Sequence, residues 1–104
     1  MNQHSNRLAR SDWEKLTKLS TKIADAAIVE CDEPVAEKYI EDLLVLIESL
    51  LQQYGKLPSL LATKADFIHD DQMKVSLYEE AYTIAEKSDD FINMRMILDS
   101  ISEM

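Results

Sequence analysis

A pattern of small and apolar residues occurs twice in this sequence, and each residue of the second copy stands 38 positions after its counterpart in the first. The first copy comprises Ile23, Ala24, Ala27, Ala36, Ile40 and Leu43. The second comprises Leu61, Ala62, Ala65, Lys74, Tyr78 and Ala81, and Ile101 and Ser102 begin a third set. Small residues at fixed points allow helices to lie close together, and a period of this length is typical of an array of helix pairs. The pattern therefore predicts stacked helix pairs, an architecture that usually binds other proteins.

The chain has almost none of the residues that build hairpins and long loops. It contains one Gly and two Pro among 104 residues, while 46% of its residues are apolar. Helix-forming residues dominate the rest, and a chain of this length buries a modest core within one domain. These features predict an all-α fold, in which about five antiparallel helices stack as helix-turn-helix pairs in a small single domain.

Capping residues indicate where the helices begin and end. Ser11, followed three residues later by Glu14, forms a capping-box arrangement that predicts the start of the first helix. Asp32 ahead of Pro34 predicts a second start, and Gly55 after a long apolar stripe predicts a stop. Acidic breaks further along the chain predict that aspartates cap the later helices.

These signals set the expected organisation of the chain. We expect a flexible segment at 1–10 and a helical domain at 11–104, with pairs at about 11–54 and 57–88 and a capping helix at about 91–103. The last helix of an array needs a polar outer face. The residues expected to supply that face are Asn93, Arg95, Asp99 and Glu103. A monomer is the expected state, with a homodimer through Met96 and Met104 as the alternative.

Residues 78–89, with the sequence YEEAYTIAEKSD, resemble the second helix of a tetratricopeptide repeat. Leu61, Ala62 and Ala65 stand upstream at the distances where that family's first helix carries its small and aromatic residues. The first copy of the pattern is a weaker match, and the resemblance covers roughly residues 17–104. An unrelated bundle of four or five antiparallel helices would give the same spacing, so both architectures remain open.

The resemblance implies a binding face. In tetratricopeptide arrays the first helix of each pair lines the concave surface that holds the partner. The residues of this chain at such positions are Asp25, Lys56, Thr63, Asp66, Phe67 and Asp99. Because three of them are aspartates, the resemblance implies a basic or amphipathic partner segment. Phe67 has a second interpretation, as a residue of the core.

The charge of the chain restricts the class of partner. Residues 1–22 carry five Lys or Arg against two Asp or Glu, whereas residues 23–104 carry six against eighteen, and the net charge is −9. An acidic body repels nucleic acid and anionic lipid, so neither is an expected partner. It favours a basic protein, although a negative surface also serves simply to keep a small protein in solution.

Cysteine usage and hydropathy predict a cytoplasmic protein. Cys31 has no second thiol with which to form an internal disulfide, which suits a reducing compartment. The first ten residues lack the apolar core of a secretory signal. The longest apolar stretch, 43–51, is interrupted by Glu48 and is too short to span a bilayer.

Motifs of catalysis do not occur in the sequence. It has no Gly-rich phosphate loop, no pair of histidines at metal-ligand spacing and no Cys-x-x-Cys. His69 stands next to Asp70 and Asp71, but turn and capping chemistry accounts for these acids. We therefore predict a protein that is not an enzyme and that needs no cofactor or metal.

Two functional hypotheses follow from size, acidity and helical content. The first is an adaptor or chaperone that mediates protein-protein interaction through a basic or amphipathic segment of its partner. The second is an immunity or antitoxin protein that inhibits a basic toxin by direct binding. The expected partner is thus another protein, such as a basic toxin, an effector or an assembly subunit.

Overall fold

The structure of the protein is a computed structural model, which describes residues 8–104. The described chain forms helices and no strands, so the predicted all-α fold is confirmed. The first seven residues of the predicted flexible segment lie outside the described range. The helices belong to two compact units, one that ends at Tyr54 and one that begins at Gly55.

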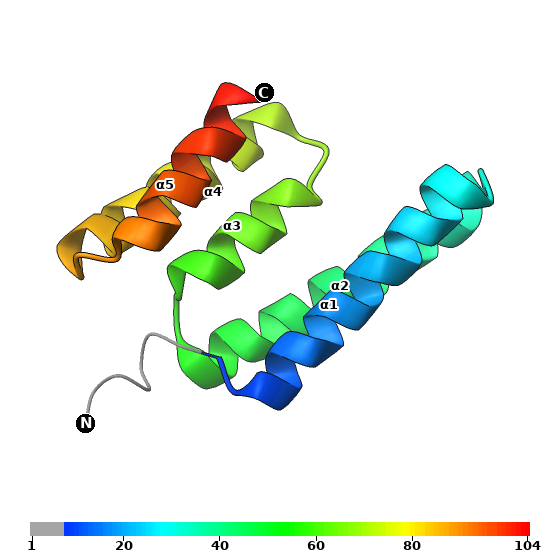
Figure 1. Cartoon of the computed structure of the whole chain (residues 1–104), viewed down its shortest axis with the longest axis horizontal. Helices are drawn as coiled ribbons and strands as arrows, with labels where there is room; N and C mark the ends of the chain where they lie inside the picture. Colours follow the sequence, from blue (N-terminus) through cyan, green and yellow to red (C-terminus); the bar gives the residue numbers. More distant parts are fainter. Residues whose placement is uncertain (1–7) are drawn as a thin grey trace. The chain divides into compact units, whose positions relative to one another are not determined.

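The first unit is a helical hairpin. Helix α1, Arg10–Ala24, continues into a π-helical segment, η2, Asp25–Val29, and after a short turn α2, Glu33–Tyr54, runs back along both (Figure 1). Asp32 begins α2 as predicted, since its carboxylate accepts the backbone N–H of Val35 at 3.2 Å. The buried residues of this unit are Leu16, Ile23, Ala26, Ala36, Leu43, Ile47 and Leu50.

The start of α1 differs from the predicted capping box at Ser11 and Glu14. The helix begins one residue earlier, at Arg10, and its N-cap residue Ala9 has no side chain that could cap it. The hydroxyl of Tyr54 takes that role: it accepts the N–H of Ala9 at 3.1 Å and donates to the carboxylate of Asp12 at 2.6 Å. A tertiary contact from the end of α2 therefore replaces the local cap.

The alanines at the end of α1 and in η2 differ in burial. Ala26 is buried, with 1% of its surface exposed, whereas Ala24 and Ala27 are both exposed. The prediction that Ala24 and Ala27 lie at close helix contacts is therefore wrong in the first copy of the pattern. In the second copy, Ala65 is fully buried.

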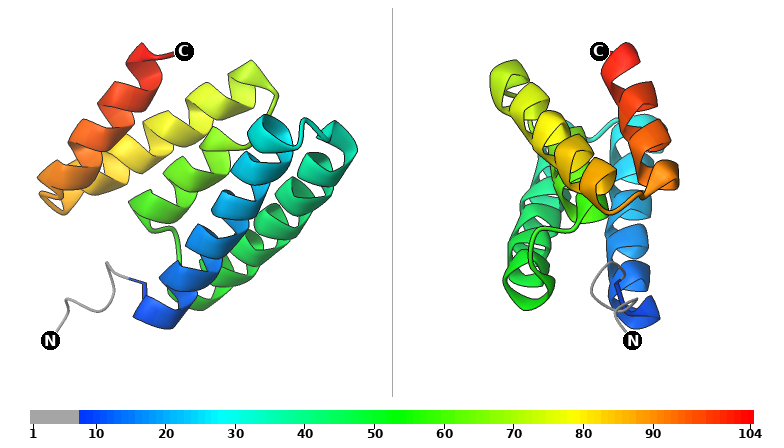
Figure 2. Two further views of the ribbon diagram at one scale, coloured as in Figure 1. Left: turned by 45° about the vertical axis from the view of Figure 1, so that its right-hand side comes forward. Right: turned by 90° about the vertical axis from the view of Figure 1, so that its left-hand side faces the viewer.

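The second unit contains three shorter helices. These are α3, Pro58–Asp66; α4, Asp71–Lys87; and α5, Phe91–Ser102. Consecutive helices run in opposite directions, and α4 packs against both α3 and α5 (Figure 2). Asp70 and Asp90 cap α4 and α5 through their carboxylates, which confirms the aspartate caps predicted for these helices. The buried residues are Leu57, Pro58, Leu60, Leu61, Ala65, Tyr78, Ala81, Ala85 and Ile97.

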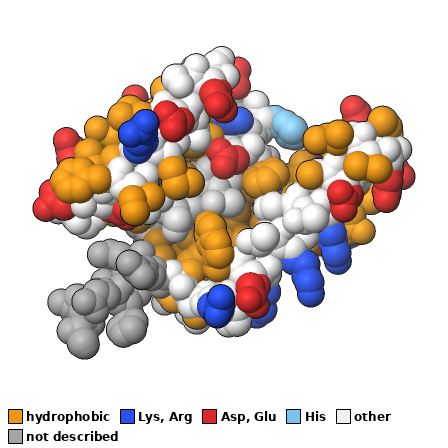
Figure 3. Space-filling view, in the orientation of Figure 1, with side chains coloured by type: hydrophobic (Ala, Val, Ile, Leu, Met, Phe, Trp, Pro, Cys, Tyr) orange, Lys and Arg blue, Asp and Glu red, His pale blue; other side chains and the backbone are white. Residues whose placement is uncertain are grey.

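The outward side of α5 is mixed: Arg95, Asp99 and Glu103 are exposed as predicted and Asn93 is half-buried, but large apolar side chains are exposed beside them, which was not predicted. Four large apolar side chains of α5 are exposed, with exposed fractions of 69% for Phe91, 75% for Ile92, 59% for Met96 and 51% for Leu98. Figure 3 shows hydrophobic side chains on the part of the surface that α4 and α5 form. The reason is the register of the helix: once Ile97 turns inward, these four residues turn outward. We call them the α5 face.

Candidate functional site

The α5 face surrounds a pair of opposite charges. Arg95 and Asp99 lie one helical turn apart on the exposed side of α5, between Phe91 and Leu98 on one flank and Ile92 and Met96 on the other. Several exposed apolar side chains grouped on one helix form a candidate surface for contact with another protein.

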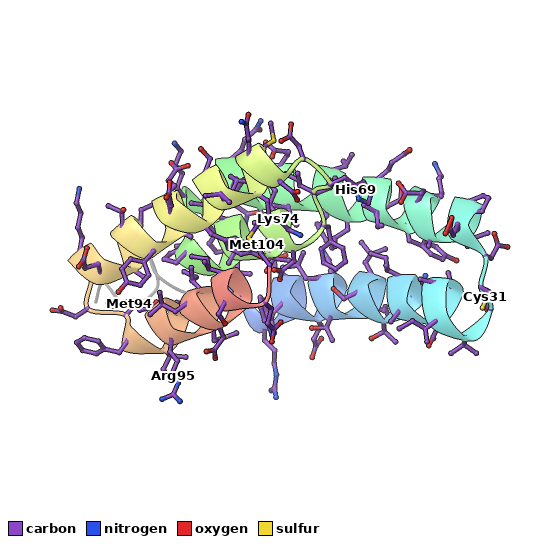
Figure 4. The ribbon with its side chains drawn as sticks, turned by 90° about the horizontal axis from the view of Figure 1, so that it is seen from above. Cys31, His69, Lys74, Met94, Arg95 and Met104 are labelled. Atoms are coloured by element: carbon purple, nitrogen blue, oxygen red, sulfur yellow. The ribbon has the colours of Figure 1, made fainter. Side chains whose placement is uncertain are left out.

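The second unit also has a polar recess of about 230 Å³, next to the end of α5. Its lining residues are Asp66, Lys74, Tyr78, Ser100, Glu103 and Met104. Figure 4 shows Lys74 of α4 and Met104 at the end of the described chain close together in this unit. The recess is open to solvent, and three helices contribute to it, because α3 ends, α4 begins and α5 ends at the same side of the unit.

A hydrogen bond from Tyr78 to Asp66 forms the floor of the recess. Tyr78 is 2% exposed, and burial, together with the bond to the Asp66 carboxylate, raises the pKa of its hydroxyl to about 12. Asp66 as a whole residue is exposed, but its carboxyl group faces Tyr78, and loss of water contact raises its pKa. Donation from Tyr78 and the charge of Lys74 act in the opposite direction on that carboxyl.

These pKa directions define what the recess can do chemically. A tyrosine with a pKa of about 12 stays protonated at neutral pH, so Tyr78 serves as a hydrogen-bond donor rather than as a base or nucleophile. Among residues 8–104, no group of three or more His, Cys, Asp or Glu side chains is arranged to hold a metal ion. The Tyr78–Asp66 bond thus joins α4 to the end of α3, and the recess has the character of a structural polar contact.

The predicted partner-binding residues are distributed over both units. Asp25 belongs to the first unit, where it is exposed in η2. In the second unit the ammonium of Lys56 contacts the carboxylate of Glu80 at 2.8 Å, which raises the pKa of the lysine. Thr63 is half-buried, and its hydroxyl donates to the carbonyl of Ser59 in its own helix at 2.7 Å.

The remaining predicted residues have different environments within the second unit. Phe67 is half-buried at the end of α3, Asp66 contributes to the recess, and Asp99 is exposed beside the α5 face. The apolar side chains of that face were not among the predicted binding residues. Their signal was present in the sequence, since Phe91 and Ile92 directly follow a capping aspartate and cannot both face inward.

The recess also contains residues that the sequence pattern did not select. Lys74 and Tyr78 are one turn apart on α4, and Ser100 and Glu103 are one turn apart near the end of α5. Such spacings place each pair on one side of its helix. Only the packing of α4 against α5 brings the two pairs to one recess.

No helix within residues 8–104 combines the length and the apolar character needed to cross a membrane. Comparisons of the chain with protein families, with curated proteins and with solved structures found no match.

Proposed function

We propose that this chain is a protein-protein interaction module, and that its partner contributes a helical segment with apolar and basic side chains. The observation that carries this proposal is the α5 face. Isolated apolar residues at a surface are ordinary, but here four large ones are exposed on a single helix of 12 residues, on the two flanks of a charged pair. Contact with another protein would remove these side chains from water.

The charge around the α5 face supports a partner with basic side chains. Ile92, Met96, Asp99 and Glu103 follow one another at four- and three-residue steps, so one line along α5 changes from apolar to acidic. The whole second unit, residues 55–104, carries ten acidic and five basic side chains. A partner helix that is apolar at one end and basic at the other would match both parts of this line.

The arrangement suits an adaptor or chaperone of the cytoplasm. Such a protein holds a segment of its partner without changing it chemically, and an open helical surface is sufficient for that role. In this proposal α5 supplies the apolar contact, while Asp99 and Glu103 set the orientation of the basic end and accelerate the encounter.

Affinity capture with matched variants tests the proposal. The full chain serves as bait in lysate of the cells that express it, alongside Ile92→Ser and the control Val45→Ser. Val45 is 70% exposed on α2, so its replacement removes an exposed apolar side chain from the other unit. We expect a protein that wild type and Val45→Ser retain equally and that Ile92→Ser loses by tenfold or more.

Quantitative binding then tests the role of charge. The affinity of the captured protein should fall as salt rises from low concentration to about 0.15 M, where the screening length is about 8 Å. The proposal is wrong if Ile92→Ser retains every protein that the wild type retains, or if binding is insensitive to salt and to Asp99→Asn together.

A further inference from the structure

We propose that the α5 face also binds a second copy of this chain, through an antiparallel pairing of two α5 helices about a two-fold axis. This inference goes beyond the proposed function, because the dimer forms without any other protein. It rests on the opposite charges at the centre of the face, which are complementary to each other and therefore to the same face of a second molecule.

Arg95 and Asp99 have no charged partner elsewhere in the described part of the chain. No ion pair within 4.0 Å involves either side chain among residues 8–104, although they are one turn apart. In Figure 4 Arg95 points away from the ribbon of α5. Both side chains are exposed, so a second molecule that approaches the face meets a cation and an anion at fixed separation.

Symmetry decides how two such faces can pair. In a two-fold dimer each contact occurs twice, since residue i of one copy meets residue j of the other and the reverse holds too. An antiparallel pairing with its axis at the level of Ile97 sets Arg95 opposite Asp99 of the partner subunit, and does so twice. The same axis keeps each flank against its own copy, so Met96 meets Met96 of the partner subunit on one side and Leu98 meets Leu98 of the partner subunit on the other. A parallel pairing in register would bring Arg95 against its own copy, which repels.

The apolar side chains must supply most of the free energy of association. Each copy carries a net charge of −9, so two copies repel at long range, and two exposed Arg–Asp pairs offset this only locally. One helix per copy gives a contact at or below the low end of specific interfaces, roughly 1,200 Å² in total. We therefore expect a weak, concentration-dependent dimer whose formation moderate salt favours, because salt screens the net repulsion.

Charge reversal in trans tests this geometry. The full chain, Arg95→Asp, Asp99→Arg and an equimolar mixture of the two variants are compared by sedimentation velocity over a range of concentrations. We expect wild type to dimerise, and each single variant to associate at least tenfold more weakly because both of its cross-contacts become repulsive. In the mixture every cross-contact is again between opposite charges, so a one-to-one heterodimer should recover wild-type affinity.

The mixture separates this inference from its competitors. Wild type that remains monomeric at every concentration overturns the dimer, as does a mixture that associates no better than the single variants. In the second case the charges act within one copy. Circular dichroism of each variant checks that the helices persist. The proposed function fails separately: wild type would dimerise, while Ile92→Ser and wild type would capture the same proteins from lysate.

Discussion

Each unit of the molecule uses a tyrosine–aspartate hydrogen bond to hold one helix against another, but the two tyrosines differ in burial. In the first unit Tyr54 at the end of α2 donates to Asp12 in the first turn of α1, and Tyr54 is half-buried. In the second unit Tyr78 in the middle of α4 donates to Asp66 at the end of α3, from a position that is 2% exposed. The same chemistry therefore acts once at a helix start and once between a buried tyrosine and the end of a neighbouring helix.

The physical consequence lies in the tyrosines' acidity. Both pKa values are raised, mainly by the aspartate bond for Tyr54 and mainly by burial for Tyr78. Burial removes the water that would stabilise a phenolate, so the larger effect belongs to the second unit.

The two units also differ in where they expose apolar side chains. In the first unit these residues are distributed over three elements: Trp13 on α1, Ile28 and Val29 on η2, and Val45 on α2. In the second unit four of them lie on α5 alone. Two units with equal numbers of charged side chains among their described residues, ten acidic and five basic in each, thus present different surfaces. Clustering on α5 is the reason that we assign binding to the second unit.

The largest effect on stability should come from a cavity created in the core of either unit. Leu43 on α2 is 0% exposed and Ile97 on α5 is 1% exposed, so replacing each by Ala should lower the free energy of unfolding by about 2–5 kcal/mol. Urea denaturation measures this, with the exposed Val45→Ala as control. A small loss for Ile97→Ala beside a large loss for Leu43→Ala would mean that α5 contributes little to the core of its unit.

Removing each tyrosine hydroxyl should have the next largest effect on stability, and the size of that effect should differ between the two units. Tyr78→Phe deletes the bond of a buried tyrosine to a carboxylate, and bonds to charged groups contribute about 1.5–3 kcal/mol. Tyr54 is only half-buried, so water replaces its lost hydroxyl more readily, and the effect of Tyr54→Phe on the free energy of unfolding should be smaller. Equal losses for both variants in chemical denaturation would contradict the distinction between the two tyrosines.

Replacing an alanine of each copy of the small-residue pattern by a larger residue tests whether that alanine lies at a close contact between helices. Ala81 is fully buried, so Ala81→Leu should overpack α4 and cost roughly 1–3 kcal/mol. Ala27 is exposed in η2, and Ala27→Leu should change stability little. Thermal unfolding of both variants is the measurement, and a large loss for Ala27→Leu would show that this position packs closely after all.

The fold was predictable because its signals are local. Asp70 and Asp90 cap helices where their positions ahead of apolar periods indicated, and Gly55 follows the end of α2 with a φ of 85°, a conformation that glycine adopts readily. The start of α1 was not predictable in this way. Its cap is a hydroxyl 45 residues further along the chain, and no local motif signals such a contact.

The candidate site was predictable only in part, because it depends on helix rotation. In η2 Ala26 is buried and Ala27 is exposed, although the spacing of the sequence pattern selected Ala27. On α5 the alternation of apolar and polar residues allowed Leu98 to face the core, whereas packing selected Ile97. Sequence periodicity identifies the helices, but tertiary packing decides which of several apolar residues remain exposed.

The smallest effect that we predict is a dependence of stability on alkaline pH. The pKa of Tyr78 is about 12 in the folded protein, compared with 10.0 for the ordinary side chain. A group whose pKa rises on folding stabilises the folded state. This contribution is fully present below the pKa of the group in the unfolded chain, and it is lost as the pH rises through the pKa of the group in the folded protein. Between pH 10 and pH 12, unfolding should therefore become easier, because the unfolded chain releases the Tyr78 proton first.

Urea midpoints at pH 9 and pH 11.5 measure this loss, with Tyr78→Phe and Tyr54→Phe as the matched pair. Other ionisations act on both variants alike, so the difference between variants isolates each hydroxyl. Tyr78→Phe should lose less stability across this interval than wild type, since it has no proton to release at this position. Tyr54→Phe should follow wild type more closely, because Tyr54 is only half-buried and water reaches its hydroxyl more readily than that of Tyr78. If Tyr54→Phe instead removes the larger part of the alkaline loss, the buried bond to Asp66 does not hold the Tyr78 proton, and the contrast between the two units disappears.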